Sequence, residues 1–124
     1  MFYAGGDTTM TGGGGTNEFV FSTAGNNTIK DFGASPSNEL IFSNLDFNLG
    51  LDGATPSPQP IMPSEVMQLF DLNGTFTKAS QRFAYDQSTG ELFASSNGSA
   101  KTEHLVATLS DHATINASQL YFVA

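Results

Sequence analysis

The chain has no cysteine, and it has only four lysine or arginine residues against twelve acidic ones, which gives a formal net charge of −8. Without cysteine there is no disulfide framework, no zinc–thiolate site and no thiol nucleophile. The shortage of positive charge argues against binding to nucleic acid, because an acidic surface repels phosphate backbones. Divalent cations are the partners that such a surface favours.

Long apolar runs are missing as well. No stretch approaches the ~18 apolar residues of a membrane-spanning helix, so no membrane insertion is expected. The first residues do not have the basic and then apolar pattern of a signal peptide, so any export signal is expected elsewhere. The low pI of about 4.2 and the abundance of small polar residues suit a secreted bacterial protein. We therefore expect a secreted, extracellular or cell-surface location.

Short apolar segments separated by turn residues predict an all-β chain. One short helix is expected at 64–70, with Ser64 as its N-cap. Ile29 and Phe32 are expected in the core, and Gly90 is expected to adopt a positive φ in a hairpin turn. A second hairpin turn is expected at Asn97-Gly98. The predicted strands are 19–21, 27–32, 39–42, 82–86, 91–94, 104–109 and 119–124.

A segment rich in proline and glycine, residues 48–63, divides the chain in two. Prolines stiffen such a segment toward extended conformations, so it is expected to be a surface loop. The predicted organisation is one compact domain with a first part at 1–47, the loop at 48–63 and a last part at 64–124.

The most informative motif is a nine-residue unit that begins with four glycines, Gly12 to Val20, and occurs as a single, degenerate copy. It follows the pattern Gly-Gly-x-Gly-x-Asp-x-apolar-x, with Asn17 in the aspartate place and Phe19 in the apolar place. This pattern is the calcium-binding nonapeptide of parallel β-rolls. In that chemistry glycines allow tight turns at positive φ and aim carbonyl oxygens inward, while the acidic side chain completes an oxygen cage.

Three segments together resemble the C-terminal end of RTX proteins, the calcium-binding repeat proteins that leave bacteria through type I secretion channels. The first segment is the nonapeptide running into Phe19-Val20-Phe21. The second, residues 27–32 followed by 38–45, is similar to the family's "Asp-x-Ile-x-Asp-Phe" and "Asp-x-Ile-x-Leu-Ser-x-Leu" segments. The third, residues 83–93 followed by 105–109 and 120–123, resembles the segment that closes these rolls.

The resemblance implies a short parallel β-roll (β-solenoid) remnant continued by an antiparallel hairpin cap. It also implies Ca²⁺ and the type I secretion machinery as partners. Asn17, Asn27 and Asn38 stand where the family usually has aspartate, so any calcium site is expected to be weak. The candidate metal ligands are the backbone carbonyls of Gly12 and Gly14, the side chain of Asn17, and the carboxylates of Asp7 and Asp31.

No catalytic constellation is visible. His104 and His112 each follow an acidic residue, but neighbouring residues on a strand point to opposite faces. No nucleophile elbow, metal-binding helix or phosphate-binding glycine loop is present either. The sequence thus predicts a non-enzymatic domain without an organic cofactor.

The predicted function is that of a domain that caps a calcium-binding β-roll and supports secretion and folding of an exported protein. One alternative is a self-associating or adhesive extracellular module, in which a sheet edge pairs with a copy of the same chain. A second alternative is a carbohydrate-binding appendage of a polysaccharide-active enzyme.

Overall fold

The computed structural model describes residues 2–124. The chain is 31% strand and 13% helix, and its strands form two mixed sheets. In spatial order, the first sheet consists of β1 (Phe2–Tyr3), β3 (Glu18–Phe21), β5 (Glu39–Ser43), β11 (Leu120–Val123) and β6 (Gln59–Pro60). The second consists of β2 (Thr9–Met10), β4 (Asn27–Ile29), β10 (His104–Leu109), β9 (Glu91–Ala94), β8 (Phe83–Asp86) and β7 (Phe70–Asp71).

The first five strands alternate between the two sheets. β1, β3 and β5 lie side by side in the first sheet and are parallel, with Phe2 opposite Phe19 and Phe19 opposite Leu40. β2 and β4 are parallel neighbours in the second sheet, with Thr9 opposite Thr28. We call one passage through both sheets a coil, so that residues 2–18 form coil 1 and residues 19–39 form coil 2.

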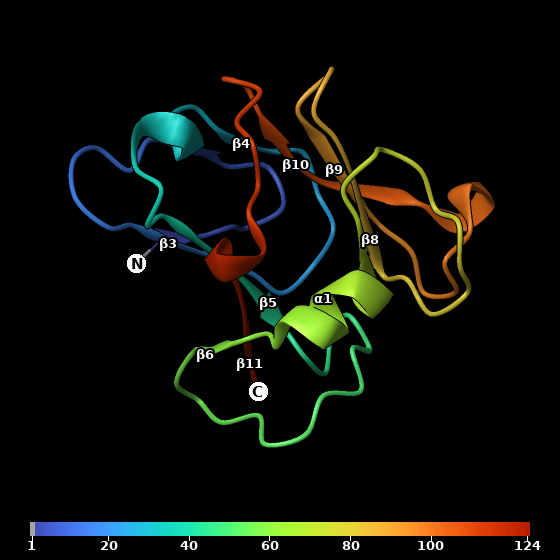
Figure 1. Cartoon of the computed structure of the whole chain (residues 1–124). Coiled ribbons are helices and arrows are strands. Elements are labelled where there is room, and N and C mark those ends of the chain that lie inside the picture. The colour runs from blue at the N-terminus through green and yellow to red at the C-terminus, as the bar shows by residue number, and fades with distance from the viewer. Residues whose placement is uncertain (1) are drawn as a thin grey trace.

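The C-terminal half extends both sheets at one end of this stack. β10 pairs in parallel with β4, and β11 pairs in parallel with β5. β10, β9 and β8 then continue the second sheet as an antiparallel meander. We call residues 64–124 the cap. Figure 1 shows the cap strands β8, β9 and β10 beside the coil strand β4, with β11 running alongside β5.

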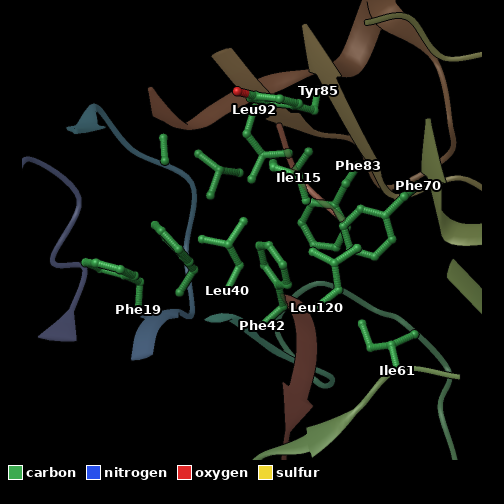
Figure 2. Close-up of a cluster of buried hydrophobic side chains, with 14 of the residues drawn as sticks. Phe19, Leu40, Phe42, Ile61, Phe70, Phe83, Tyr85, Leu92, Ile115 and Leu120 are labelled. Atoms are coloured by element: carbon green, nitrogen blue, oxygen red, sulfur yellow. The ribbon is translucent and has the colours of Figure 1, made fainter. Parts of the chain in front are cut away.

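One hydrophobic core joins the coils to the cap. Phe42 on β5 packs against Phe21 at a ring-centroid distance of 5.7 Å and against Phe83 of the cap at 4.3 Å. Phe83 also stacks on Phe70 at 4.8 Å. Figure 2 shows these cap side chains pointing toward those of the coils. Each buried aromatic side chain contributes roughly 1.5–3 kcal/mol to folding, so this cluster stabilises the attachment of the cap in addition to the strand pairing.

The short helices and one long loop complete the chain. The α-helix, α1, spans Pro63–Leu69 and buries Val66 and Leu69. Three 3₁₀ turns span Phe32–Ala34 (η1), Ala100–Thr102 (η2) and Ala117–Gln119 (η3). Residues 48–60 form a broad loop beside the C-terminal end of β11 (Figure 1).

Most of the predicted strands are present, and Ile29 and Phe32 are fully buried as expected. Gly90 has φ +76°, and a Cβ there would lie 2.1 Å from the carbonyl oxygen of Leu109, so only glycine fits this turn. The predicted helix is also present, but its cap is wrong. Pro63 occupies the first turn and Met62 is the N-cap, because proline's fixed φ and missing N–H suit that position.

Two other expectations need correction. The strand expected at 27–32 ends at Ile29, because Asp31 turns toward a neighbouring loop and Phe32 begins η1. Asn97-Gly98 does not form a two-residue hairpin turn. β9 and β10 are antiparallel neighbours, but they are joined by a longer loop in which the Asn97 side chain accepts hydrogen bonds from Ser95 and Thr102.

Candidate functional site

The glycine run of the nonapeptide forms the turn between β2 and β3, and a carboxylate from the next coil closes it. Asp31 accepts hydrogen bonds from the backbone N–H groups of Gly12 and Gly13, both at 2.9 Å. These two bonds stabilise the charged carboxylate and hold the pKa of Asp31 below its usual value. Gly13 and Gly15 have positive φ, as the turn requires.

Asn17 closes the same turn from its other end. Its side chain lies over Gly12, where a Cβ would come within 2.7 Å of the Asn17 amide. The Asn17 amide nitrogen donates to the carbonyl of Gly13 at 3.2 Å and to Oδ1 of Asn38 at 3.3 Å. This NH₂ group therefore lies between two oxygen atoms, in a position that suits a positive charge.

The asparagines in the aspartate places link one coil to the next. Buried Asn38 accepts from the backbone N–H of Asn17 and donates its own amide to the carbonyl of Phe32 at 3.0 Å. Only an amide can accept and donate in this way, since a carboxylate has no donor. The sequence pattern indicates only the lost charge of these positions and does not reveal this donor role.

Asn27 has the same dual role where coil 1, coil 2 and the cap meet. Its Oδ1 accepts from the backbone N–H groups of Gly6 and Thr8, both at 3.1 Å, and its amide nitrogen donates to the carbonyl of Val106 at 2.9 Å. The pairing of β10 with β9 shifts register between Leu105 and Ala107, as at a β-bulge. The amide of fully buried Asn27 thus supplies a hydrogen-bond partner to the Val106 carbonyl, which the irregular pairing of β10 with β9 leaves without one.

Two further side chains of the cap form hydrogen bonds with the coils, and the sequence patterns predicted neither of them. Gln119 is buried, donates to the carbonyl of Asn38 at 3.2 Å and accepts from the N–H of Asn116 at 2.9 Å. Asp111 accepts from the N–H of Gly33 at 2.8 Å. Among residues 2–124, no buried side-chain nitrogen or oxygen lacks a hydrogen-bond partner.

The structure brings together some of the predicted metal ligands. Gly12, Asn17 and Asp31 meet at the glycine turn, and Gly14 lies exposed at its tip. Asp7 does not join them, because it precedes β2 whereas the glycines follow that strand. In the described part of the chain, no three acidic or histidine side chains gather as a metal site. An ion at this turn would therefore depend on carbonyl and amide oxygens together with Asp31.

A second group of acids lies on the outer face of the first sheet. Glu18 on β3 is directly opposite Glu39 on β5. Burial, together with the neighbouring Glu18 carboxylate, raises the pKa of Glu39, while a hydrogen bond from Tyr121 opposes that shift. Burial also raises the pKa of Tyr121, and the Glu39 carboxylate adds to this effect.

The repulsion between Glu18 and Glu39 is expected to lower the stability of the folded chain in a pH-dependent way. A group whose pKa is raised in the folded state favours folding below its unfolded pKa, and that contribution is lost as pH rises through the folded value. Glu39→Gln should therefore stabilise the chain at pH 7 by roughly 0.2–1 kcal/mol, as for like charges directly opposite each other. The gain should vanish near pH 4 in thermal melts. Glu65→Gln in α1 is the control, and an equal gain from it would refute the pair effect.

Other sequence candidates do not converge. His104 and His112 are both exposed, and His112 lies in a turn with φ +51°.

Tyr85 is buried and donates to the carbonyl of Ala113 at 2.5 Å. Burial and the nearby Asp111 and Asp86 carboxylates raise the pKa of Tyr85 to about 12. No helix within residues 2–124 has the length and apolar character needed to cross a bilayer.

No family model, no curated protein and no solved structure matches this chain. Its residues and their geometry are therefore the basis for inferring a function.

Proposed function

We propose that this chain is the closing unit of a parallel β-roll in an exported protein, a non-enzymatic domain that supports folding and secretion. The observation that carries the proposal is the alternation of β1 to β5 between two sheets in parallel register, continued by β10 and β11 of the cap. A stack of this kind needs a terminal element that covers its last coil, because each coil buries its apolar residues only against its neighbours.

The two ends of the stack differ, which supports the role of a cap. At the cap end, β11 is followed in the first sheet by β6, which contains Pro60, a residue that cannot donate to a ladder. At the other end, β1 and β2 have a neighbour on one side only within the described chain. That open end would receive a further coil of the roll.

The proposed mechanism links folding to calcium. Inside a cell, where calcium is scarce, acidic segments would repel one another and the chain would stay unfolded and suitable for a type I export channel. Outside, calcium that binds only the folded chain would shift the equilibrium toward folding by RT ln(1 + [L]/Kd). The glycine turn offers the oxygens of Gly13, Asn38 and Asp31 as a weak site. Because Asn17 already closes the turn, calcium should increase the stability of the native chain only slightly.

Asn17→Asp tests the calcium part of the proposal. The substitution removes the NH₂ group that lies between the oxygens of Gly13 and Asn38 and puts a carboxylate in its place. In chelator the variant should lose about 1–3 kcal/mol, the cost of unsatisfied polar groups. Millimolar calcium should restore that loss, so the calcium-dependent gain in Tm should be larger than for the native chain.

Magnesium should not reproduce the gain, because it dehydrates reluctantly and demands octahedral geometry. Asn26→Asp is the matched control, since it adds the same charge at an exposed position outside the turn. If native chain and Asn17→Asp each melt identically in chelator and in millimolar calcium, the glycines only turn the chain. The calcium linkage would then be wrong.

Self-association is a second candidate function, favoured by the unpaired edges of β1 and β2 at the open end of the stack. Unpaired strand edges are templates for pairing with another chain. Coil 1 also carries few charges, with Asp7 and Glu18 its only acids, so two copies could approach there with little repulsion. Sedimentation over a range of concentrations, with and without chelator, tests this role. A monomer at all concentrations would exclude it.

A further inference from the structure

A groove of about 390 Å³ lies on the outer face of the first sheet. The accessible part of its floor consists of Val20 on β3 and Val123 on β11, whose side chains alternate with core-facing neighbours, and Ile41 on the intervening β5 is fully buried beneath it. Tyr3 on β1 forms one wall, and its side chain is 70% exposed. A large aromatic exposed beside an aliphatic floor marks a surface on which a ligand can be buried.

The opposite wall is fixed to the sheet. It consists of Pro56 and Pro58 in the loop of residues 48–60. The N–H of Ala124 donates to the carbonyl of Thr55 at 2.8 Å, and β6, which follows the two prolines, pairs with β11. The groove is therefore formed before a ligand arrives, which lowers the entropic cost of binding.

The charge around the groove has one sign. Its polar end consists of Ser22, Ser43 and Asp46, and none of the lining residues in the described chain is positively charged. Glu18 and Glu39 lie on the same face of β3 and β5, toward the beginning of these strands. With a net charge of −8 on the whole chain, this surface attracts cations and repels anions.

We propose that the groove binds a small organic cation with an apolar body, of the quaternary ammonium class. The apolar body lies on Val20 and Val123. The cationic group faces the Tyr3 ring, whose electron-rich face attracts ammonium ions, within the field of Asp46. A metal ion is a poorer fit, because the aliphatic floor offers it no oxygen ligands.

The test uses benzyltrimethylammonium and two-dimensional NMR of the full chain in buffer that contains a chelator. We expect saturable shifts of the Tyr3 ring and of the Val20 and Val123 methyl groups. Benzenesulfonate, of similar size but opposite charge, should bind at least tenfold more weakly. Raising the salt from 50 to 500 mM should weaken cation binding severalfold, because salt screens the carboxylates.

Variants locate the site. Tyr3→Ala should weaken binding about fivefold or more, whereas Tyr3→Phe keeps the ring and should retain most of the affinity. Asp46→Asn should weaken binding two- to fivefold, and Asp52→Asn, an exposed acid outside the lining, should leave it unchanged. Absence of shifts at tens of millimolar cation, equal binding of the sulfonate, or shifts confined to other residues would overturn the proposal.

Discussion

Replacing the two core-facing residues of β11, Leu120→Ala with Phe122→Ala, is expected to abolish cooperative folding. Both side chains are nearly fully buried, at 1% and 5% exposure, and β11 pairs with β5 on one side and β6 on the other. Truncating buried leucine and phenylalanine costs about 2–5 and 3–5 kcal/mol. The sum is comparable with the whole stability of a domain of this size, roughly 5–15 kcal/mol. Urea unfolding followed by circular dichroism measures the loss.

The matched control lies on the same strand. Tyr121 and Val123 alternate with the core residues and are only partly buried, so Tyr121→Ala with Val123→Ala should cost far less. Deleting residues 120–124 should also abolish cooperative folding, as the double substitution of Leu120 and Phe122 is expected to do. If the deletion melts within a degree of the native chain, β11 does not contribute to the folded structure and the expectation is wrong.

Asn27→Asp, which exchanges one amide nitrogen for an oxygen, is expected to cause a large loss of stability. The new carboxylate would be fully buried and would face the carbonyl of Val106, to which the native amide donates. An unpaired buried charge costs several kcal/mol, so we expect at least about 3 kcal/mol at pH 7. Chemical denaturation of the variant and native chains gives the difference directly.

The pH dependence of this variant supplies an independent check. Burial would raise the folded-state pKa of the new carboxyl above its unfolded value. Its stability relative to the native chain should then recover as pH falls and be lost as pH rises through the folded pKa. Asn26→Asp adds the same charge at the neighbouring exposed position and should change stability little. Equal effects of the two substitutions would mean that the Asn27 amide does not hold the coils to the cap.

Local sequence patterns were sufficient to locate the longer strands, whereas the two-residue strands β1, β2, β6 and β7 were not predicted. Phe19, Phe21, Leu40 and Phe42 alternate with outward-facing residues, and glycines or prolines flank them, so period and turn chemistry agree. Gly90 was predictable for the same reason, since its turn needs a positive φ that other residues rarely adopt. These features depend on neighbours within a few residues.

The links between coils were not predictable in this way. The partners of Asn27 lie 19, 21 and 79 residues away along the chain, and Gln119 reaches Asn38 across 81 residues. The family's sequence pattern treats Asn27 and Asn38 only as aspartates that have lost their charge. Only the stacking of coils reveals that their amides must donate as well as accept. Asp7 was misplaced for a related reason, because the pattern does not say at which end of β2 a carboxylate lies.

Extending the stack by one coil tests the central claim most directly. A tandem duplication of residues 2–18 places the new Phe2 opposite the original Phe2, with the spacing that sets Phe2 opposite Phe19 in the native chain. If the open end receives coils, the longer chain should unfold in one transition at higher temperature, and amide exchange should slow in β1 and β2. A scrambled insert of the same composition is the control. An unchanged Tm with unprotected β1 and β2 amides, equal to the scrambled chain, would contradict the proposal that this chain closes a β-roll.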